Sequence, residues 1–329
     1  MTQRYTGKTN LLFLIVIRDS KNMLQVIYNS TPLWDYFIDN CKKKHNYAFI
    51  KLQKKQNIFA SRNMLARCVN LAIGKYIDLG YRYIINGNFN QIANNDTILL
   101  LGIYNYAELF RLRKRFQSNK MVLWLWNPVM KTYRRNAYDV IRRLKSLKYE
   151  IFTFDDADAK EFNLGLRSQF TLIPSANLKD KNNIKYDTYF LGQPKGRLKI
   201  LKRLEQIYTE MGIKYCFKIV NTPADYIPYE ENIRNVSLSK SVLELCQEGQ
   251  RGLTLRALEA MLCHRKLITN NKSIVEEDFY SPQNVFVIGK DTNENLKHFI
   301  DSDFVVVDDA ILEKYDFNNW LEYFYYKMK

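Results

Sequence analysis

Short apolar runs alternate with longer amphipathic stretches along most of the 329-residue chain. Such runs are typical of strands buried on both faces of a parallel sheet, and the amphipathic stretches of the helices that cover it. In the first half, the pattern predicts strands at residues 11–17, 97–101, 121–126 and 150–154. We therefore expect an α/β protein with parallel sheets.

The same pattern begins again after residues 172–185, a polar segment with one proline that is typical of a linker. A glycine-containing turn and a helix at 198–211 follow the first strand of this second half. Strands are expected at residues 186–191, 214–220, 242–246, 266–269 and 285–288. Because 329 residues exceed what one hydrophobic core usually serves, we expect two domains, at residues 1–184 and 185–310.

The last segment, residues 311–329, has the pattern of an amphipathic helix with Asp316 as its N-cap. Its apolar stripe consists of Phe317, Trp320, Leu321, Phe324 and Met328. We expect this helix to pack back on the body of the protein. A helix lying on a membrane surface is the alternative, because Lys327, Lys329 and several tyrosines accompany the stripe.

The positive charge of the chain is confined to its first half. Residues 1–184 contain 30 Lys+Arg and 13 Asp+Glu, whereas the rest contain 20 and 21, out of totals of 50 and 34. A predicted helix at 131–148 carries part of this charge on its outer face, at Arg134, Arg135, Arg142, Arg143 and Lys145. Such a field suits an anionic membrane surface, a lipid-linked phosphate or a nucleic acid. A solvated helix face is the simpler interpretation of any single residue.

Cysteine and histidine are too few and too scattered to indicate a metal centre or a disulfide framework. The chain has five cysteines, none in a CxxC pair, and three histidines. The apolar run at 11–17 is too short to span a bilayer, and no small-residue cleavage site follows it. We therefore expect a cytoplasmic protein, with peripheral contact to the inner face of the cytoplasmic membrane.

Two segments pair a strand with a glycine-containing turn and a following helix, an arrangement whose free N–H groups favour phosphate. In the segment at 246–261, Arg256 and Glu259 lie one turn apart and offer a cation for a diphosphate and a carboxylate for a ribose diol. An ordinary surface ion pair is the alternative. In the second segment, at 192–197, Lys195 and Arg197 add charge to the turn.

These segments carry a family resemblance. The sequences YDTYFLGQPKGR at 186–197 and GQRGLTLRALEA at 249–260, followed by KLITNN at 266–271, resemble bacterial GT-B glycosyltransferases of capsule and lipopolysaccharide assembly. The resemblance extends from about residue 186 to 301. It implies two Rossmann-like lobes facing across a cleft, with the nucleotide-sugar donor on the second lobe and the acceptor on the strongly basic first lobe. By position, it implies a donor site formed by Gly192, Lys195, Arg197, Gln250, Thr254, Arg256 and Glu259.

The chain departs from the retaining members of that family, many of which carry two glutamates eight positions apart. Leu267 follows Glu259 by eight positions and Arg251 precedes it by eight, so the pair is absent and the stereochemical outcome stays open. An inverting enzyme needs a base near the cleft. Asp19, directly after the first predicted strand, is our candidate. The competing candidates follow the strand at 150–154, at Asp155, Asp156 and Asp158.

We therefore expect a glycosyltransferase that moves a sugar from a nucleotide-sugar donor to a saccharide acceptor, lipid-linked, in capsule or lipopolysaccharide assembly. The nucleotide sugar is its substrate, and we expect neither a cofactor nor a metal. Another sugar-nucleotide enzyme, an epimerase or a hydrolase, is the first alternative. A basic nucleic-acid-binding protein is the second, and is disfavoured because the sequence contains no nucleic-acid-binding module.

Overall fold

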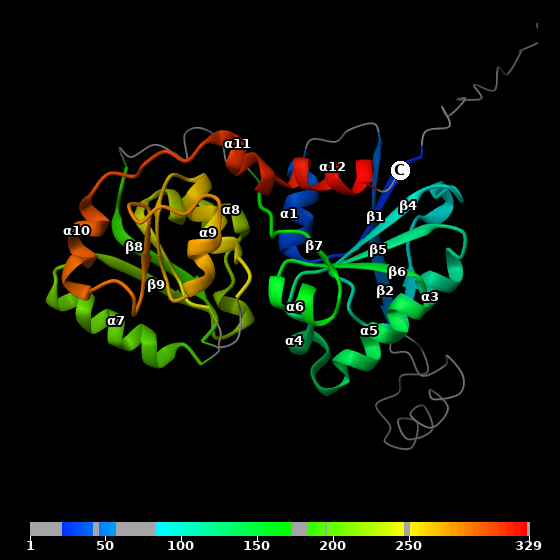
Figure 1. Ribbon diagram of the computed structural model, residues 1–329, viewed down its shortest axis with the longest axis horizontal. Helices are drawn as coiled ribbons and strands as arrows, with labels where there is room; N and C mark the ends of the chain where they lie inside the picture. Colours follow the sequence, from blue (N-terminus) through cyan, green and yellow to red (C-terminus); the bar gives the residue numbers. More distant parts are fainter. Residues whose placement is uncertain are drawn as a thin grey trace, which may run out of the picture.

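The computed structural model describes residues 22–41, 46–56, 83–172, 183–194, 196–246 and 251–327. They form two α/β lobes, each built on one sheet, which lie side by side (Figure 1). The predicted strand at 11–17 lies outside the described residues. So do three of the candidate site residues, Asp19, Lys195 and Gln250.

The first lobe contains a seven-stranded sheet in the order β3-β2-β1-β4-β5-β6-β7. Its strands are β1 (Leu24–Asn29), β2 (Tyr47–Gln56), β3 (Tyr83–Asn86), β4 (Thr97–Leu101), β5 (Lys120–Leu125), β6 (Tyr149–Thr153) and β7 (Gly165–Leu166). The pairs are parallel except β2 with β3, and the strand order reverses between β1 and β4. Strands β4, β5 and β6 confirm three of the predicted strands.

The helices of the first lobe cover both faces of its sheet. They are α1 (Pro32–Asn40), α3 (Tyr106–Arg115), α4 (Val129–Tyr133), α5 (Ala137–Ser146) and α6 (Asp156–Glu161), with 3₁₀ turns η2 (Phe89–Gln91) and η3 (Arg134–Asn136). The single helix predicted at 131–148 is wrong, because it is broken into α4, η3 and α5. The N–H of Val129 donates to the buried carboxylate of Asp158, which starts α4 early, and Arg134 with φ 52° then interrupts the helix.

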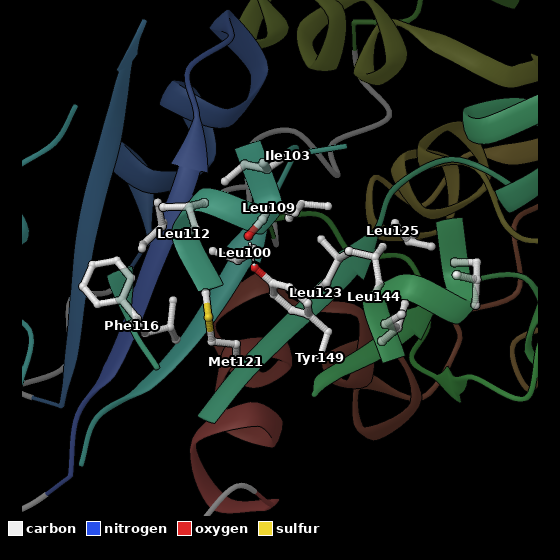
Figure 2. Packing of buried hydrophobic residues seen from close by; sticks show 14 of the residues in the cluster. Leu100, Ile103, Leu109, Leu112, Phe116, Met121, Leu123, Leu125, Leu144 and Tyr149 are labelled. Atoms are coloured by element: carbon white, nitrogen blue, oxygen red, sulfur yellow. Dashed lines mark hydrogen bonds between the residues drawn. The ribbon is translucent and has the colours of Figure 1, made fainter. Parts of the chain in front are cut away.

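Alternate side chains of the central strands enter two separate cores, as the two-residue period of a strand requires. Leu100 and Leu123 pack on one face beneath α3 and α5, where the Tyr149 hydroxyl donates to the Leu109 carbonyl at 2.6 Å (Figure 2). Leu101 and Trp124 pack on the other face, beneath α1 and the last helix.

The second lobe contains a five-stranded, fully parallel sheet in the order β12-β11-β10-β8-β9. Its strands are β8 (Tyr186–Gly192), β9 (Tyr215–Ile219), β10 (Ser239–Glu244), β11 (Lys266–Thr269) and β12 (Val285–Val287). Its helices are α7 (Leu198–Glu210), α8 (Tyr229–Ser237), α9 (Leu255–Leu262), α10 (Leu296–Asp301) and α11 (Asp309–Leu312), and its 3₁₀ turns are η5 (Pro223–Asp225), η6 (Lys272–Glu276), η7 (Asn293–Asn295) and η8 (Glu313–Tyr315). All five strands and the first helix predicted for this half are confirmed.

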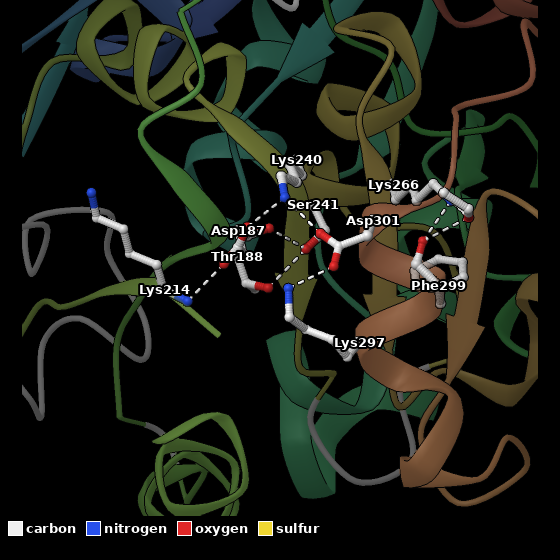
Figure 3. Close-up of polar contacts among 10 residues, drawn as sticks. Asp187, Thr188, Lys214, Lys240, Ser241, Lys266, Lys297, Phe299 and Asp301 are labelled. Carbon is white, nitrogen blue, oxygen red and sulfur yellow. Dashed lines mark hydrogen bonds and ion pairs between the residues drawn. The ribbon is translucent and has the colours of Figure 1, made fainter. Parts of the chain in front are cut away.

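An ionic cluster ties α10 to the amino-terminal ends of the strands of this sheet (Figure 3). Lys240, at the start of β10, pairs with Asp187 of β8 at 2.8 Å and with Asp301 of α10 at 2.6 Å, and Lys297 also pairs with Asp301 at 2.6 Å. Because the strands are parallel, these charges lie at the amino-terminal end of the sheet, and the residues that follow the strands lie at its opposite, carboxyl-terminal end. The cluster is therefore structural.

The last helix, α12 (Phe317–Lys327), returns to the first lobe and covers its sheet (Figure 1). The ring of Trp320 lies 5.0 Å from that of Trp124 and 4.3 Å from that of Phe170. The helix begins directly after Asp316, the expected N-cap. Among the described residues, no helix has the length and apolar character needed to cross a bilayer.

Candidate active site

A cleft of about 690 Å³ lies between the two lobes, where the strands of the second sheet end. The start of α1 forms its wall on the first lobe, from Thr31 to Leu33. Gly192, Arg197, Arg256 and Glu259 line it on the second lobe. The structure therefore brings four of the seven predicted donor-binding residues together in one cleft. Ligands of open α/β sheets bind at this position, beyond the carboxyl ends of the strands.

Gly192, the last residue of β8, is the point on which two arginines converge. A Cβ atom built there would stand 2.9 Å from Nη2 of Arg256 and 3.4 Å from Nη1 of Arg197. Both guanidinium groups therefore approach the same α-carbon, Arg197 from the N-cap of α7 and Arg256 from α9, and the missing side chain leaves the space that they occupy.

Arg256 is held in place by the strand that ends at Gly192. Its Nε donates to the carbonyl of Leu191 at 2.8 Å, its Nη2 donates to the same oxygen, and its guanidinium lies 5.6 Å from the ring of Phe190. Thr254 accepts from the N–H of Arg256 at 3.1 Å and so caps α9. These contacts fix the direction in which the guanidinium points.

Arg197 is nearly inaccessible, with 7% of its surface exposed. Burial, and next the charge of Arg256, hold its pKa below the usual range. Its Nε is buried without a hydrogen-bond partner among the described residues. A buried guanidinium with an open donor beside a second guanidinium is a favourable environment for an anion with several oxygens, such as a phosphate.

Glu244 lies behind these two arginines and was missed by the sequence reasoning. It is the last residue of β10, is fully buried, and accepts hydrogen bonds from the hydroxyls of Thr254 and Thr269. Burial raises its pKa, while the hydroxyl donors and the arginine charges act in the opposite direction. The available signal was an acidic residue inside an apolar run, between Leu243 and Leu245. Thr254 thus supports Glu244 and α9, and is not among the described residues that line the cleft.

Glu259 lies one helical turn after Arg256 and forms part of the cleft wall. Only 3% of its surface is exposed, and Tyr229 and Asn232 line the same cleft. Burial raises the pKa of its carboxyl, and the charge of Arg256 lowers it. This burial is inconsistent with an ordinary surface ion pair between Arg256 and Glu259. A buried carboxylate facing a cleft instead suits recognition of hydroxyl groups.

The loop before α9 is also held by the first lobe. Oδ2 of Asp155 accepts from the N–H groups of Gly252 at 2.9 Å and Arg251 at 3.4 Å, while its Oδ1 caps α6. A Cβ atom on Gly252 would stand 2.6 Å from the ring of Phe154. Because the two lobes approach so closely here, only glycine fits without a shift.

The three aspartates that competed for the role of base have structural partners. Asp155 caps α6 and holds the Gly252 loop, Asp158 accepts from the N–H of Val129 at 2.7 Å, and Asp156 pairs with Lys160 at 3.2 Å. Burial raises the pKa of Asp158 to about 6. In the parts of the chain that the structure describes, no three His, Cys, Asp or Glu side chains are grouped so as to bind a metal ion.

No protein-family model matches the sequence, and no curated protein matches it. Solved structures with a similar fold include a UDP-forming α,α-trehalose-phosphate synthase from Burkholderia xenovorans, with a TM-score of 0.55, 12% identity, and 92% of this chain and 98% of that chain covered. The N-terminal domain of trehalose-6-phosphate phosphatase from Candida albicans has a TM-score of 0.58, 11% identity and 99% coverage of both chains. The synthase from B. xenovorans in complex with glucose-6-phosphate has a TM-score of 0.54, 10% identity, and coverage of 93% and 99%.

At these identities the similarity concerns the fold. Together with the two parallel sheets, it confirms the predicted architecture of two Rossmann-like lobes of the GT-B type. The cleft between the lobes is thus the expected place for a ligand in such a fold.

Proposed function

We propose that this chain of GT-B fold is a glycosyltransferase that moves a sugar from a nucleotide-sugar donor to a saccharide acceptor. The observation that carries the proposal is the convergence of the Arg197 and Arg256 guanidiniums on Gly192, in the cleft between the lobes. Two fixed cations at this position suit the diphosphate of a sugar nucleotide.

The other cleft residues suit the rest of a nucleotide. The buried carboxylate of Glu259 accepts hydrogen bonds and would bind the ribose diol. Val220, Tyr226 and Ile227 add an apolar wall that suits a flat nucleobase. In this arrangement, Lys195 and Gln250 add to the phosphate and sugar contacts from segments outside the described residues.

The chemistry follows from the position of the charges. The acceptor hydroxyl attacks the anomeric carbon of the donor and gives its proton to a base, for which we propose Asp19, outside the described residues. The bond from that carbon to the diphosphate oxygen breaks, and the nucleoside diphosphate leaves with additional negative charge. Arg197 and Arg256 would stabilise this leaving group because both side chains already line the cleft, where Arg256 is held by the Leu191 carbonyl. We propose that they supply the positive charge without a metal cofactor, so that turnover persists in the presence of a chelator.

The acceptor would approach from the first lobe, whose charge suits an anionic partner. The broken helix α4-η3-α5 exposes Arg134 and Arg135. The same segment exposes 60% of the surface of Tyr138 and 46% of that of Met130. An aromatic side chain and a methionine next to cations suit the interface of an anionic membrane. We therefore propose a lipid-linked acceptor in capsule or lipopolysaccharide assembly, used at the inner face of the cytoplasmic membrane.

Binding of sugar nucleotides tests the proposal directly. Calorimetric titration with a panel of UDP, GDP and ADP sugars should identify a donor. Arg256→Ala should then weaken its binding by about 10- to 100-fold, as expected when a charged hydrogen-bond donor to phosphate is lost. Arg203→Ala, an exposed arginine on α7, is the matched control and should bind as the wild type does.

Two results would contradict the proposal. The first is the absence of binding to every sugar nucleotide in the panel. The second is an Arg256→Ala variant with unchanged affinity. Donor turnover that needs no saccharide acceptor would favour the alternative of a hydrolase or an epimerase.

A further inference from the structure

Three consecutive residues at the carboxyl end of β11 hold the chain between β10 and α9. They are Thr269, Asn270 and Asn271, here called the TNN segment, and they end the KLITNN sequence at 266–271. Thr269 is fully buried and Asn271 is 4% exposed. Each of the three side chains takes part in a different hydrogen-bonded contact with that connection.

The contact of Thr269 is made through Glu244, at the end of β10. Oγ1 of Thr269 donates to Oε2 of Glu244 at 2.5 Å, and Oγ1 of Thr254 donates to Oε1 of Glu244 at 2.5 Å. Oγ1 of Thr269 also accepts from the N–H of Asn271 at 2.9 Å. In the same way, Oγ1 of Thr254 accepts from the N–H of Arg256 at 3.1 Å. Each hydroxyl therefore uses its proton for the carboxylate and its oxygen for the backbone, and Glu244 joins the TNN segment to the first turn of α9.

The other two contacts are made by the amide side chains. Oδ1 of Asn270 accepts from the N–H of Cys246 at 2.6 Å, and its Nδ2 donates to the carbonyl of Cys246 at 3.2 Å. Nδ2 of Asn271 donates to the carbonyl of Arg251 at 3.1 Å. The connection from β10 to α9 is thus held at Cys246, at Arg251 and at the start of the helix.

These contacts bear directly on the position of Arg256. Its backbone N–H is bound by Thr254, and its guanidinium is bound by the carbonyl of Leu191. Glu244 and the TNN segment are not among the described residues that line the cleft. Any effect that they have on a ligand would therefore pass through the groups that they hold.

We propose that Glu244 and the TNN segment are positioning residues, which hold Arg256 in the orientation that binds the diphosphate of the donor. This rests on the proposed function. A protein whose binding-competent conformation is populated in only a fraction of the molecules binds its ligand more weakly by that fraction. If loss of one contact leaves the start of α9 in place in about one tenth of the molecules, the Kd rises about tenfold.

Variants outside the cleft test this inference in the full-length protein. The probes are UDP, GDP and ADP, and the one that binds the wild type most tightly is used throughout. Glu244→Gln offers one acceptor oxygen to two hydroxyl donors, and should raise the Kd about tenfold. Thr269→Val removes one of these donors and should raise the Kd about threefold. Thr269→Ser restores the hydroxyl and should recover most of the affinity that Thr269→Val loses.

A double-mutant cycle shows whether the effect passes through Arg256. Glu244→Gln should raise the Kd of the Arg256→Ala variant by less than about twofold, because the group that Glu244 positions is already absent. A residue that only stabilises the fold would instead change the Kd by the same factor in both backgrounds.

Thr188→Val is the matched control. Thr188 is fully buried in β8 of the same sheet, and its Oγ1 lies 2.8 Å from Oγ of Ser241 in β10 (Figure 3). The replacement removes a buried threonine hydroxyl away from the cleft, so it should lower the melting temperature and leave the Kd unchanged. Thermal melts also establish that each variant is folded. If Glu244→Gln does not fold, Thr269→Val carries the test, with its own cycle against Arg256→Ala.

The outcomes separate this inference from the proposed function. A wild-type Kd in Glu244→Gln and Thr269→Val, or equal losses with and without Arg256, would overturn the positioning role alone. Absence of nucleotide binding by the wild-type protein would instead refute the proposed function, and the positioning role with it.

Discussion

Replacement of Gly192 by alanine should separate ligand binding from folding. The added methyl group would stand 2.9 Å from Nη2 of Arg256, 3.0 Å from Cζ of Phe190 and 3.4 Å from Nη1 of Arg197. Carbon atoms do not approach other heavy atoms so closely, so something must shift. The nearest atom is the end of a long side chain, and we expect the Arg256 guanidinium to move away from the Leu191 carbonyl.

The displacement of the Arg256 guanidinium should lower both the stability of the protein and its affinity for the ligand. The protein loses part of two hydrogen bonds from Arg256 to the Leu191 carbonyl, which we expect to lower stability by about 1 kcal/mol. The ligand loses a charged donor aimed at its phosphate, which should raise the Kd by about tenfold or more. Calorimetric titration with the best sugar nucleotide measures the second quantity, and urea unfolding measures the first.

Gly212→Ala is the control for this experiment. Gly212 has φ +64°, and no described atom lies within 4 Å of the point that a Cβ atom would occupy there, so an added methyl group strains the backbone but contacts no other group. This variant should lose about 1 kcal/mol of stability and keep its affinity. A Gly192→Ala variant that binds the donor as tightly as the wild type would refute the assignment of the two arginines to the ligand.

Three further predictions concern the lobes and their surfaces. Asp155→Asn leaves one carbonyl oxygen for two tasks, capping α6 and holding Gly252, and should raise the KM for the donor severalfold more than it lowers kcat. Burial raises the pKa of Glu277 to about 7 from an ordinary 4.5, so the folded state favours its protonated form. The stability that protonated Glu277 provides is fully present below pH 4.5 and is lost as the pH rises through 7. Relative to the wild type, Glu277→Gln should therefore gain about 1 kcal/mol in free energy of unfolding between pH 5 and 8, as measured by urea unfolding. Equal pH profiles of the two proteins would contradict this. Replacing Arg134 and Arg135 by glutamate should weaken sedimentation with anionic liposomes without changing the donor Kd, and a loss of donor binding would contradict the assignment of the lobes.

Much of the strand content was readable from the sequence, because strands buried on both faces are continuous apolar runs. This holds for β4, β5 and most of the second sheet. Strand β1 was missed because a stronger apolar run at 11–17 precedes it and because Gln25 interrupts its own apolar pattern. Gln25 is nevertheless fully buried, and its amide donates to Asp96 at 2.7 Å. That partner is 71 positions away and is supplied only by the pairing of β1 with β4.

Some features of the candidate site were likewise predictable from the sequence, and others were found only in the tertiary structure. The glycine-containing turns, the helix starts and the spacing of Arg256 and Glu259 are local features, so the sequence was sufficient to propose them, with the family resemblance adding the ligand. The convergence of Arg197 and Arg256 on Gly192, the support from Glu244, and the hold of Asp155 on a loop 97 positions later came only from the tertiary structure. Local patterns record which residues are buried and where helices begin, because those depend on neighbours within a few positions. Which distant segments meet depends on how the two sheets pack against their helices and each other, and that packing brings the charges of the cleft together.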